Sequence, residues 1–423
     1  MISSPLLKMN ASGRRIAMKY EPLEKVYWKN PEPSTVHQQE YRRRYNSPFT
    51  EHIRIDIKQH NRKRSFPAFF CYTNECAMLL EQILIEHQKL QTIIDKLPKI
   101  VLDQFSLLCI LDEVKSSNDI EGVRSTRKEL RETISNPTAR SRFQSTVAKY
   151  AMLLGHEKIQ LDSSNDLRKF YEEFAYQEVL EADANNRLDG TIFRKDDVDI
   201  EQTIGKTIHR GVYPEAKIID YVDTMLSFAH NDNVPIIIRT AICHYLLAYI
   251  HPFYDGNGRT ARVLSSYALK QILHQSVAMR LSVCIRKNKE RYYRLLGDTD
   301  CEHNCGDLTP FVIGFMEIIV QSIKDSCRLL NRKLEQFRKN MALIDRLSDD
   351  PLTLDMYKAL FQSSLLFGQG LCMDDLSRYL GKSKNTIYSR LKALPEGHVL
   401  ATRLNRQIFY RFNLLILRDL NKA

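Results

Sequence analysis

The sequence predicts an all-α protein with one short β-hairpin, followed by a small C-terminal domain. Apolar residues recur at three- and four-residue spacing over long stretches between residues 76 and 345, which is typical of helices with one buried face. Before residue 399, short β-branched runs punctuated by glycine or proline occur only between residues 190 and 213. Asp349-Asp350-Pro351 then interrupts the helical pattern, and a different pattern follows it.

Composition and charge exclude several classes of protein. The chain has 423 residues, of which 43% are hydrophobic and 27% charged, so disorder throughout, collagen and a membrane bundle are ruled out. The net charge of +11 comes from the two ends, because residues 1–66 hold 14 basic and 6 acidic side chains and residues 351–423 hold 11 and 5. No stretch reaches ~18 apolar residues, and the start lacks the apolar core of a signal peptide. We therefore expect a cytoplasmic protein that does not contact a membrane.

Residues 1–75 are expected to form a basic N-terminal arm. Up to residue 66 this segment contains the clusters Arg42–Arg44 and Arg62–Arg64 among scattered prolines and aromatic residues, with no sustained periodicity. We interpret it as a loosely ordered arm that lies on the body of the protein. The alternative is a tail that binds nucleic acid.

The helical core is expected over residues 76–350. From Cys76 onward, apolar residues such as Leu80, Ile83 and Leu90 follow the helical period. Further apolar helical runs follow at 166–181, 215–230, 234–250, 259–275 and 308–345.

The nine cysteines are odd in number and scattered through apolar surroundings, which indicates reduced core thiols rather than a disulfide framework. One cluster, Cys301-Glu302-His303-Asn304-Cys305, has residue types that bind zinc. It lacks the second pair of ligands that a tetrahedral zinc site needs. We interpret it as a polar loop.

Residues 351–423 resemble a winged helix-turn-helix. The turn Gly381–Lys384 separates two short helices, the second helix begins near Asn385, and Val399–Thr402 and Gln407–Phe412 are expected to form a two-stranded wing around a turn at residues 404–406. Five apolar residues share one face of the two helices: Leu376, Leu380, Ile387, Leu391 and Leu394. Four polar residues are expected to face outward: Asn385, Tyr388, Ser389 and Lys392. The basic surplus of this segment fits DNA binding, and a dimerisation or protein-docking module is the alternative.

The chemistry is carried by residues 251–262, HPFYDGNGRTAR, which connect two apolar helices. Gly256 and Gly258 permit a backbone in which successive N–H groups converge at the start of the second helix. Such a turn is an anion-binding nest, so phosphates are expected to bind there.

The side chains of the same string suit a phosphate ligand. Arg259 and Arg262 are three residues apart and can reach outlying phosphate oxygens with bidentate forks. Asp255 supplies an oxygen ligand for a Mg²⁺ ion that bridges phosphates. His251 is the one side chain of the string whose ordinary pKa lies near neutrality, and it lies where a nucleophile would approach the phosphate.

The string resembles the signature of the Fic family, H-P-F-x-[D/E]-G-N-G-R-x-x-R, at every specified position. Fic proteins are known as all-helical enzymes, most of which transfer AMP from ATP to a hydroxyl side chain of a target protein and release pyrophosphate. The resemblance implies that His251 is the general base for the target hydroxyl and that Asp255 holds Mg²⁺ or Mn²⁺. It also implies phosphate-binding roles for Asn257, the backbone of Gly256 and Gly258, and the side chains of Arg259 and Arg262.

A second string, near residues 112–122, resembles the inhibitory motif of the family, [S/T]-x-x-x-E-[G/N]. Ser117, Glu121 and Gly122 carry this match. Ser117 and Glu121 are four residues apart and share a helix face, and Gly122 is a natural helix stop. The resemblance implies that Glu121 pairs with Arg262 and blocks productive binding of the γ-phosphate.

Weaker resemblances concern the nucleotide pocket and the target. Tyr292 and Tyr293 match a family stretch near the adenosine, and Asn304 matches an asparagine that contacts adenine. A flap strand that aligns the target chain is expected at 194–198 or 207–213, in a region longer than the usual flap.

The sequence thus predicts an autoinhibited protein adenylyltransferase with ATP as substrate and Mg²⁺ or Mn²⁺ as metal. Its protein substrate would offer a Ser, Thr or Tyr hydroxyl. One alternative is the removal of AMP from a modified protein, in which Glu121 would position a hydrolytic water. Another is a nucleotide-sensing regulator that binds DNA through residues 351–423. A homodimer is also compatible with the sequence.

Overall fold

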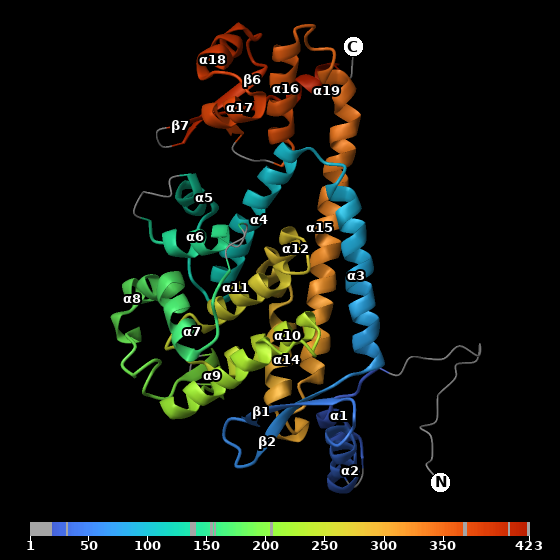
Figure 1. Cartoon of the computed structure of the whole chain (residues 1–423), viewed down its shortest axis with the longest axis vertical. Helices are drawn as coiled ribbons and strands as arrows, with labels where there is room; N and C mark the ends of the chain where they lie inside the picture. Colours follow the sequence, from blue (N-terminus) through green and yellow to red (C-terminus); the bar gives the residue numbers. More distant parts are fainter. Residues whose placement is uncertain are drawn as a thin grey trace, which may run out of the picture. The chain divides into compact units, whose positions relative to one another are not determined.

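Helices predominate in the computed structural model of the protein (Figure 1), which confirms the predicted all-α class. The structure describes residues 19–30, 33–135, 141–152, 155, 158–203, 206–366, 370–404 and 407–420. The chain divides into two compact units. Unit 1 comprises residues 1–85, 158–269 and 287–320, and unit 2 comprises residues 86–157, 270–286 and 321–423.

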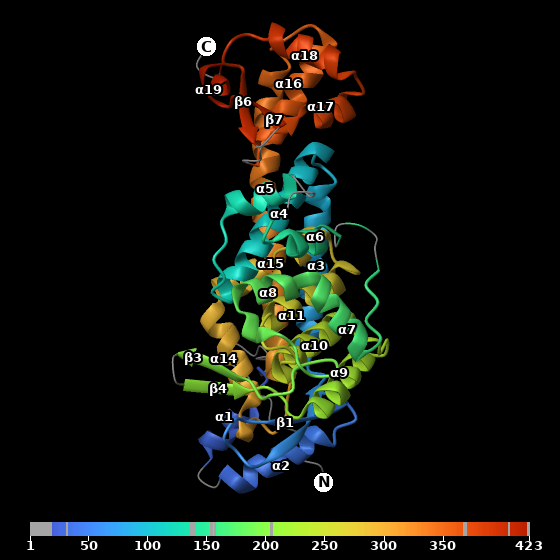
Figure 2. The same cartoon turned by 90° about the vertical axis from the view of Figure 1, so that its left-hand side faces the viewer.

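Unit 1 is built mainly of helices around α10. Its elements are α1 (Leu23–Lys29), α2 (Pro33–Tyr45), β1 (Thr50–Lys58), β2 (Ser65–Cys71), α7 (Ser164–Tyr171), α8 (Gln177–Ala182), β3 (Asp199–Thr203), β4 (Lys206–Arg210), α9 (Glu215–Ala229), α10 (Ile236–Ile250), α11 (Asn257–Lys270) and α14 (Lys289–Asp300). Four of the described helices contain boundaries between the units: α3 (Asn74–Ile94) and α15 (Thr309–Ile344), and, at their last residues, α11 and α13 (Leu281–Lys287). The β1–β2 and β3–β4 pairs are antiparallel hairpins, and Figure 2 shows the second of these with its strands edge to edge.

Helix α10 is the buried centre of unit 1. Apolar side chains occupy all of its faces, and only four of its 15 residues are not buried. A helix that is apolar all round is stable only when it is packed on every side. The loop that follows α10 therefore starts from a rigid support.

The N-terminal arm differs from the expectation. Instead of a loosely ordered segment, residues 50–71 form a β-hairpin, in which Ile53, Ile55 and Ile57 are buried and the residues between them are exposed. The prediction that strands before residue 399 are confined to 190–213 was wrong. Residues His52–Lys58 have the alternating pattern of a half-buried strand. The polar or charged residues at every second position made the stretch resemble a solvated segment, so the alternating isoleucines were not recognised as a buried face.

Hydrogen bonds attach this hairpin to the rest of unit 1. The N–H of Phe69 donates to the carbonyl oxygen of Gly306, and the N–H of Leu308 donates to the carbonyl oxygen of Phe69. The buried carboxylate of Asp307 also accepts a hydrogen bond of 2.6 Å from the hydroxyl of Tyr20. The segment that was expected to be a loose arm is thus part of the folded unit.

Unit 2 contains the helix with the predicted inhibitory motif and the C-terminal segment. Its elements are α4 (Lys99–Ile120), α5 (Arg127–Ser135), α6 (Gln144–Met152), α12 (Gln275–Ala278), α13 (Leu281–Lys287), α16 (Pro351–Ser364), β5 (Leu371–Cys372), α17 (Met373–Leu380), α18 (Lys384–Ala393), β6 (Val399–Leu404), β7 (Gln407–Phe412) and α19 (Leu415–Leu420). The two short helices and the strands expected in the C-terminal segment are all present. Strand β5 is an addition, and the sheet has the order β5-β7-β6.

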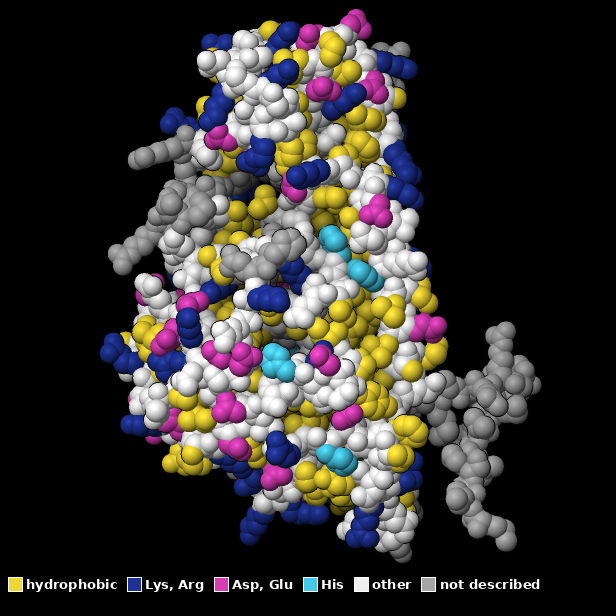
Figure 3. All heavy atoms as spheres, in the orientation of Figure 1, with side chains coloured by type: hydrophobic (Ala, Val, Ile, Leu, Met, Phe, Trp, Pro, Cys, Tyr) yellow, Lys and Arg dark blue, Asp and Glu magenta, His cyan; other side chains and the backbone are white. Residues whose placement is uncertain are grey.

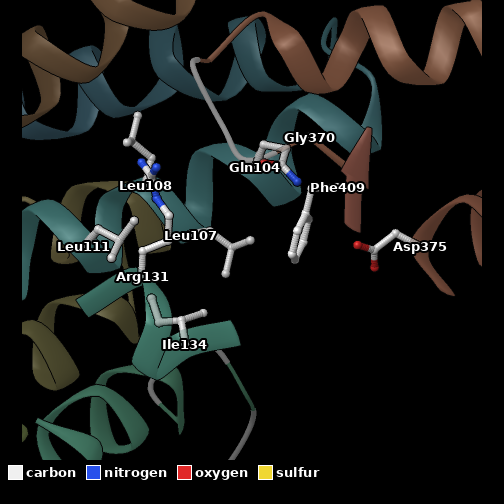
Figure 4. Close-up of a pocket in the computed structure, with 9 residues that line it drawn as sticks. All are labelled: Gln104, Leu107, Leu108, Leu111, Arg131, Ile134, Gly370, Asp375 and Phe409. Atoms are coloured by element: carbon white, nitrogen blue, oxygen red, sulfur yellow. The ribbon is translucent and has the colours of Figure 1, made fainter. Parts of the chain in front are cut away.

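The C-terminal segment packs against α4. The hydroxyl of Tyr379 in α17 donates a 2.6 Å hydrogen bond to Oδ2 of Asp103 in α4. Close to this contact, a small pocket of about 70 Å³ is lined by Leu107 of α4, Ile134 of α5 and Phe409 of β7, among others (Figure 4). Helix α4 therefore carries both the predicted inhibitory motif and a surface that the C-terminal segment covers.

All nine cysteines lie in the described residues and are free thiols, as the sequence predicts. Within the described ranges, no helix has the length and apolarity needed to cross a membrane. Basic and acidic side chains are mixed over the face in Figure 3, so the positive surplus does not form one large patch on that face.

Candidate active site

The predicted base, His251, ends helix α10. It adopts the left-handed conformation, with φ 53° and ψ 60°, which is uncommon for a residue other than glycine. Its Nδ1 lies 3.2 Å from the carbonyl oxygen of Ala248. Because a carbonyl oxygen can only accept, Nδ1 carries the proton in this arrangement and Nε2 keeps its lone pair. The ring is thus prepared to accept a proton at Nε2.

Burial keeps the His251 imidazole neutral. Burial, together with the positive charge of His209, lowers the pKa of His251 to about 3, although the hydrogen bond to Ala248 acts in the opposite direction. The ring is therefore unprotonated across the neutral pH range. The negative charge of a bound triphosphate would raise this pKa, because it favours the protonated form.

His209, at the end of β4, forms a buried ion pair with Asp300. Burial opposes the charged form of His209, but the carboxylate of Asp300 outweighs burial and raises the pKa of His209. Its Nδ1 lies 3.0 Å from Oδ2 of Asp300, and its Nε2 lies 2.7 Å from the carbonyl oxygen of Tyr249. Asp300 also accepts a 2.6 Å hydrogen bond from the hydroxyl of Tyr245. The pair contacts α10 through Tyr245 and Tyr249 and so connects the β3–β4 hairpin to this helix. Tyr249 lies two residues before His251.

Arg194 holds the backbone around His251. Its side chain is fully buried, and its Nε donates a 2.9 Å hydrogen bond to the carbonyl oxygen of His251. Its Nη2 donates to the carbonyl oxygen of Val212 at 2.8 Å, and the carbonyl oxygen of Ile250 lies 3.5 Å away. A cation at the C-terminal end of a helix also interacts favourably with the helix dipole. Arg194 therefore stabilises the uncommon backbone conformation of His251.

The Arg194→Ala variant is expected to lower the thermal midpoint of unfolding by about 6–10 °C, because it leaves buried carbonyl oxygens without donors. A thermal unfolding scan followed by circular dichroism measures this change. Arg187 is exposed, so Arg187→Ala serves as the control and should shift the midpoint by only about 1–2 °C. Equal midpoints for the two variants would contradict the role of Arg194.

The loop after His251 is fixed by one amide and one pair of aromatic rings. The Asn257 side chain accepts a 3.0 Å hydrogen bond from the N–H of Phe253 and donates one of 2.8 Å to its carbonyl oxygen. The Phe253 ring stacks on Tyr171 with a centroid distance of 3.7 Å, and the Tyr171 hydroxyl donates to the carbonyl oxygen of Asp255 at 2.9 Å. Both polar atoms of the Asn257 amide are thus used within the loop. This buried side chain therefore fixes the backbone of the predicted phosphate site.

The backbone of the loop has the form that the glycines predict. Gly256 has φ 82°, and helix α11 begins at Asn257. The first N–H groups of a helix have no partner within the helix, so those of Gly258 and Arg259 are available to an anion. The side chain of Asp255 is 41% exposed beside this helix start. A helix N-terminus and an exposed carboxylate are thus adjacent, which suits a phosphate with its divalent cation.

The two predicted phosphate-binding arginines are both buried. Arg259 is 2% exposed, and its Nη1 donates a 2.7 Å hydrogen bond to Glu178 of α8. Its Nη2 lies 3.4 Å from Oδ2 of Asp255. Arg262 is 1% exposed, and its charge contributes to a lowered pKa of His244. Arg259 is therefore oriented by two carboxylates.

The tandem tyrosines have different environments. The hydroxyl of Tyr292 lies 2.8 Å from Nε2 of His244, whose Nδ1 lies 2.8 Å from Oγ of Ser265. Burial, and then the charge of Arg262, lowers the pKa of His244 to about 3, so this buried histidine is neutral. Tyr293 is partly exposed and packs edge-on against Tyr292.

Asn304, the predicted adenine contact, is 1% exposed. Its Nδ2 donates to the carbonyl oxygens of Thr299 and Asp307, at 3.2 and 2.7 Å. Its Oδ1 has no hydrogen-bond partner among the described residues. An unpaired buried acceptor is costly, so this oxygen can still accept a further hydrogen bond.

The predicted inhibitory residues lie in unit 2, at the end of α4. The helix ends at Ile120, Glu121 caps it, and Gly122 has φ 75°, in agreement with its predicted role as a helix stop. Asp119 forms ion pairs with Lys115 and, at 2.7 Å, with Arg286. The last turn of α4 is thus held in place next to an exposed Glu121.

Sequence reasoning missed Arg194, Glu178, His209, Asp300 and Tyr171. Each of them acts on the 251–262 string from a distant part of the chain. None belongs to a local motif, because a contact between residues tens of positions apart leaves no spacing pattern.

Part of the chain is similar in sequence to known proteins. The model of the Fic/DOC family matches residues 163–269. Proteins named protein adenylyltransferase Fic from Drosophila melanogaster and Drosophila ananassae are 30% and 29% identical to this chain over 125 residues. The matched segment is 30% of this chain and 23% and 22% of those proteins, so it spans less than a quarter of their length.

Solved structures of Fic proteins are similar at lower sequence identity. A Fic family protein from Desulfovibrio desulfuricans G20 is 19% identical, and the alignment covers 81% of this chain and 97% of that one, with a TM-score of 0.49. Fic-1 from C. elegans is 20% identical, with coverages of 60% and 74% and a TM-score of 0.40.

The family match includes α7, α9, α10, α11 and the whole of the loop between the last two. The loop has the helix start and the left-handed His251 and Gly256 described above. Residues 163–269 therefore form a Fic domain, and the chain is a Fic-type protein.

Proposed function

We propose that this protein transfers AMP from ATP to a Ser, Thr or Tyr hydroxyl of a protein substrate and releases pyrophosphate. The observation that carries the proposal is the arrangement of His251, a neutral imidazole with a free lone pair, directly before a loop that opens the N-terminus of α11. The names of the fruit fly relatives support adenylyl transfer in general. A transferase needs a base for the hydroxyl and a site for phosphates, and these two features supply both.

In the proposed reaction, Nε2 of His251 accepts the proton of the target hydroxyl as its oxygen attacks the α-phosphorus of ATP. The new bond joins that oxygen to the α-phosphorus, and the bond from the α-phosphorus to the bridging oxygen breaks, so that pyrophosphate leaves. The N–H groups of Gly258 and Arg259 stabilise negative charge on the phosphates. Arg194 and the His209–Asp300 pair keep the base in position.

Asp255 is the proposed ligand of the divalent cation. Its carboxylate is partly exposed beside the helix start. Within the described residues, no group of three or more His, Cys, Asp or Glu side chains could hold a metal, so one protein carboxylate would act together with phosphate oxygens, which is a usual environment for Mg²⁺. When bound, such an ion neutralises phosphate charge and fixes the geometry of the triphosphate.

The Asp255→Ala variant is expected to lose AMP transfer by about 10²-fold or more, because it removes the only proposed protein ligand of the cation. Transfer of label from ATP to protein measures this loss, and excess EDTA should abolish the activity of the wild type. Asp232 is 96% exposed and pairs with Arg239, so Asp232→Ala is the matched control and should retain activity. Full activity of Asp255→Ala, or of the wild type in EDTA, would contradict the assignment.

We also propose that Glu121 restrains the reaction, as its motif implies. The end of α4 is held by the ion pairs of Asp119, and Gly122 ends the helix with Glu121 exposed. These features support a fixed inhibitory carboxylate. The alternative activity, removal of AMP from a modified protein, uses the same residue, so its test is combined with the test of inhibition below.

We propose a winged helix-turn-helix for the C-terminal segment, on the basis of its element order and its exposed α18. Two of its basic side chains are paired: Lys384 with Asp374, and Arg390 with Asp350 at 3.2 Å. Because these two cations are already paired with carboxylates, we expect DNA binding to be weak and salt-sensitive and to be carried mainly by Lys382. We propose Arg406 as a further DNA contact; it lies outside the described residues. Docking of a protein or of a second copy is the alternative role.

A further inference from the structure

A basic pocket of about 520 Å³ lies in unit 1, next to the predicted base. Its walls come from the end of β1 with the turn that follows it, from the segment after β4, and from the first turn of α9. Helix α9 lies beside β1 (Figures 1 and 2). Its lining includes the residues Lys58, Arg62, Lys63, Lys217 and Tyr249.

Two contacts connect this pocket to His251. Tyr249 lines the pocket and lies two residues before His251 in the chain. Gly211 also lines the pocket, and a Cβ atom added to it would lie 3.1 Å from the Cβ atom of His251. The side chain of the base is therefore separated from the pocket by the thickness of one backbone segment.

The walls of the pocket are held in a fixed arrangement by two tyrosines. The hydroxyl of Tyr249 accepts a 2.8 Å hydrogen bond from the N–H of Lys58 and donates one of 3.1 Å to the carbonyl oxygen of Asp56. The hydroxyl of Tyr221 accepts a 3.0 Å hydrogen bond from the N–H of Asp56. These bonds use the outer edge of β1, so its register relative to α10, and hence to His251, is fixed.

The charge of the pocket is strongly positive. Asp56 is the single acidic side chain among the described residues that line it. Lys58, Lys63 and Lys217 are exposed and make no ion pair within the part of the chain that the structure describes. The ammonium group of Lys217 lies 5.0 Å from the centre of the Tyr221 ring. Two other basic residues are partly neutralised: Arg62 lies 4.0 Å from Glu302, and Arg210 pairs with Asp199.

We propose that this pocket binds an acidic segment of the protein substrate, close in sequence to the hydroxyl that receives AMP. The inference rests on the proposed function, because it names the class of substrate for the same site. The pocket adjoins the base that must meet the target hydroxyl, so its occupant is expected to be continuous with the target chain. Three lysines without ion pairs would complement carboxylates, and such complementarity contributes to specificity and to the rate of association.

The experiment measures binding separately from transfer. Two fluorescein-labelled peptides carry one tyrosine flanked by three glutamates or, in the second peptide, by three glutamines. Fluorescence anisotropy with the full-length protein should give a Kd at least about tenfold lower for the glutamate peptide, since complementary charges add to its binding. Raising the salt from ~50 to ~300 mM should reduce this preference, because the screening length falls.

The charge-reversed triple variant Lys58→Glu, Lys63→Glu and Lys217→Glu should lose the preference for the glutamate peptide. The matched control reverses three exposed lysines of unit 2, Lys89, Lys96 and Lys339, and so changes the net charge equally. The control should keep the preference. A triple Lys→Arg variant at the pocket positions should keep it too, because the charge is retained.

The outcomes separate the pocket from the reaction. If the wild type binds both peptides equally, or the pocket variant keeps its preference, the inference is wrong. It is also wrong if the pocket variant loses binding of a fluorescent ATP analogue or of a duplex DNA while its peptide binding is unchanged, because the pocket would then serve a nucleotide or nucleic acid. If the glutamate peptide binds as expected but no AMP reaches any protein, the pocket assignment stands and the proposed transferase function fails.

Discussion

The Glu121→Gly variant is expected to modify protein, including itself, about one to three orders of magnitude faster than the wild type. Under the proposed inhibition, a carboxylate tethered in the same chain would compete with the γ-phosphate of ATP for Arg262. A tethered group has the advantage of effective concentration. Its removal abolishes a competing interaction of a few kcal/mol, and ~1.4 kcal/mol corresponds to a factor of ten.

Three further variants make this prediction specific. Arg262→Ala should not be activated, because it removes the phosphate-binding guanidinium together with its competitor. Glu121→Gln keeps the shape of the side chain but not its charge, so it should be activated if charge is what inhibits. Glu129→Gly places a glycine in the nearby helix α5 and should behave like the wild type.

If Glu121→Gly is no faster than the wild type, the inhibitory assignment fails. A second assay then shows whether Glu121 serves the reverse activity. Protein that has been labelled with AMP is incubated with the wild type and with Glu121→Gly, and free AMP is measured. Release by the wild type alone would assign Glu121 to the removal of AMP.

The His251→Ala variant is expected to lose transfer by about 10²- to 10⁴-fold, which is the usual contribution of a general base. Its affinity for ATP should stay close to that of the wild type, because in the proposed reaction Nε2 would act on the target hydroxyl and not on the triphosphate. Labelling of protein and binding of a fluorescent ATP analogue measure the two quantities. Unchanged labelling would refute the role of His251, and a parallel loss of ATP binding would assign it to nucleotide binding instead.

The part of the site that could be predicted from the sequence is its local part. Gly256 and Gly122 adopt the positive φ angles that their positions suggest, and α11 begins where the glycines place it. Local spacing is enough for such features, because a turn and the helix that follows it are determined by neighbouring residues.

The part that could not be predicted depends on contacts between distant residues. Arg194 binds the carbonyl oxygen of His251 from 57 positions away, and Glu178 binds Arg259 from 81 positions away. The amide of Asn257, predicted to contact phosphates, is used within its own loop. A motif gives the type of a residue, but only the fold determines which partner that residue meets.

The largest error in the fold prediction concerned strand β1, whose residue pattern fits both a strand and a solvated segment. Residues 52–58 alternate isoleucine with charged or polar side chains, which is the pattern of a half-buried strand. The basic clusters on both sides of this stretch suggested a solvated arm. Two residues of the second cluster, Arg62 and Lys63, lie in the turn after β1 and line the pocket proposed for acidic substrates.

One measurement tests the central claim most directly. Glu121→Gly is incubated with Mg²⁺ and cell lysate, in one series with ATP labelled at the α-phosphate and in another with ATP labelled at the γ-phosphate. The account predicts label on protein only from the α-phosphate, and none when His251→Ala is added to the variant. Label from the γ-phosphate would indicate phosphoryl transfer, and no label on protein from either position would contradict adenylyl transfer altogether.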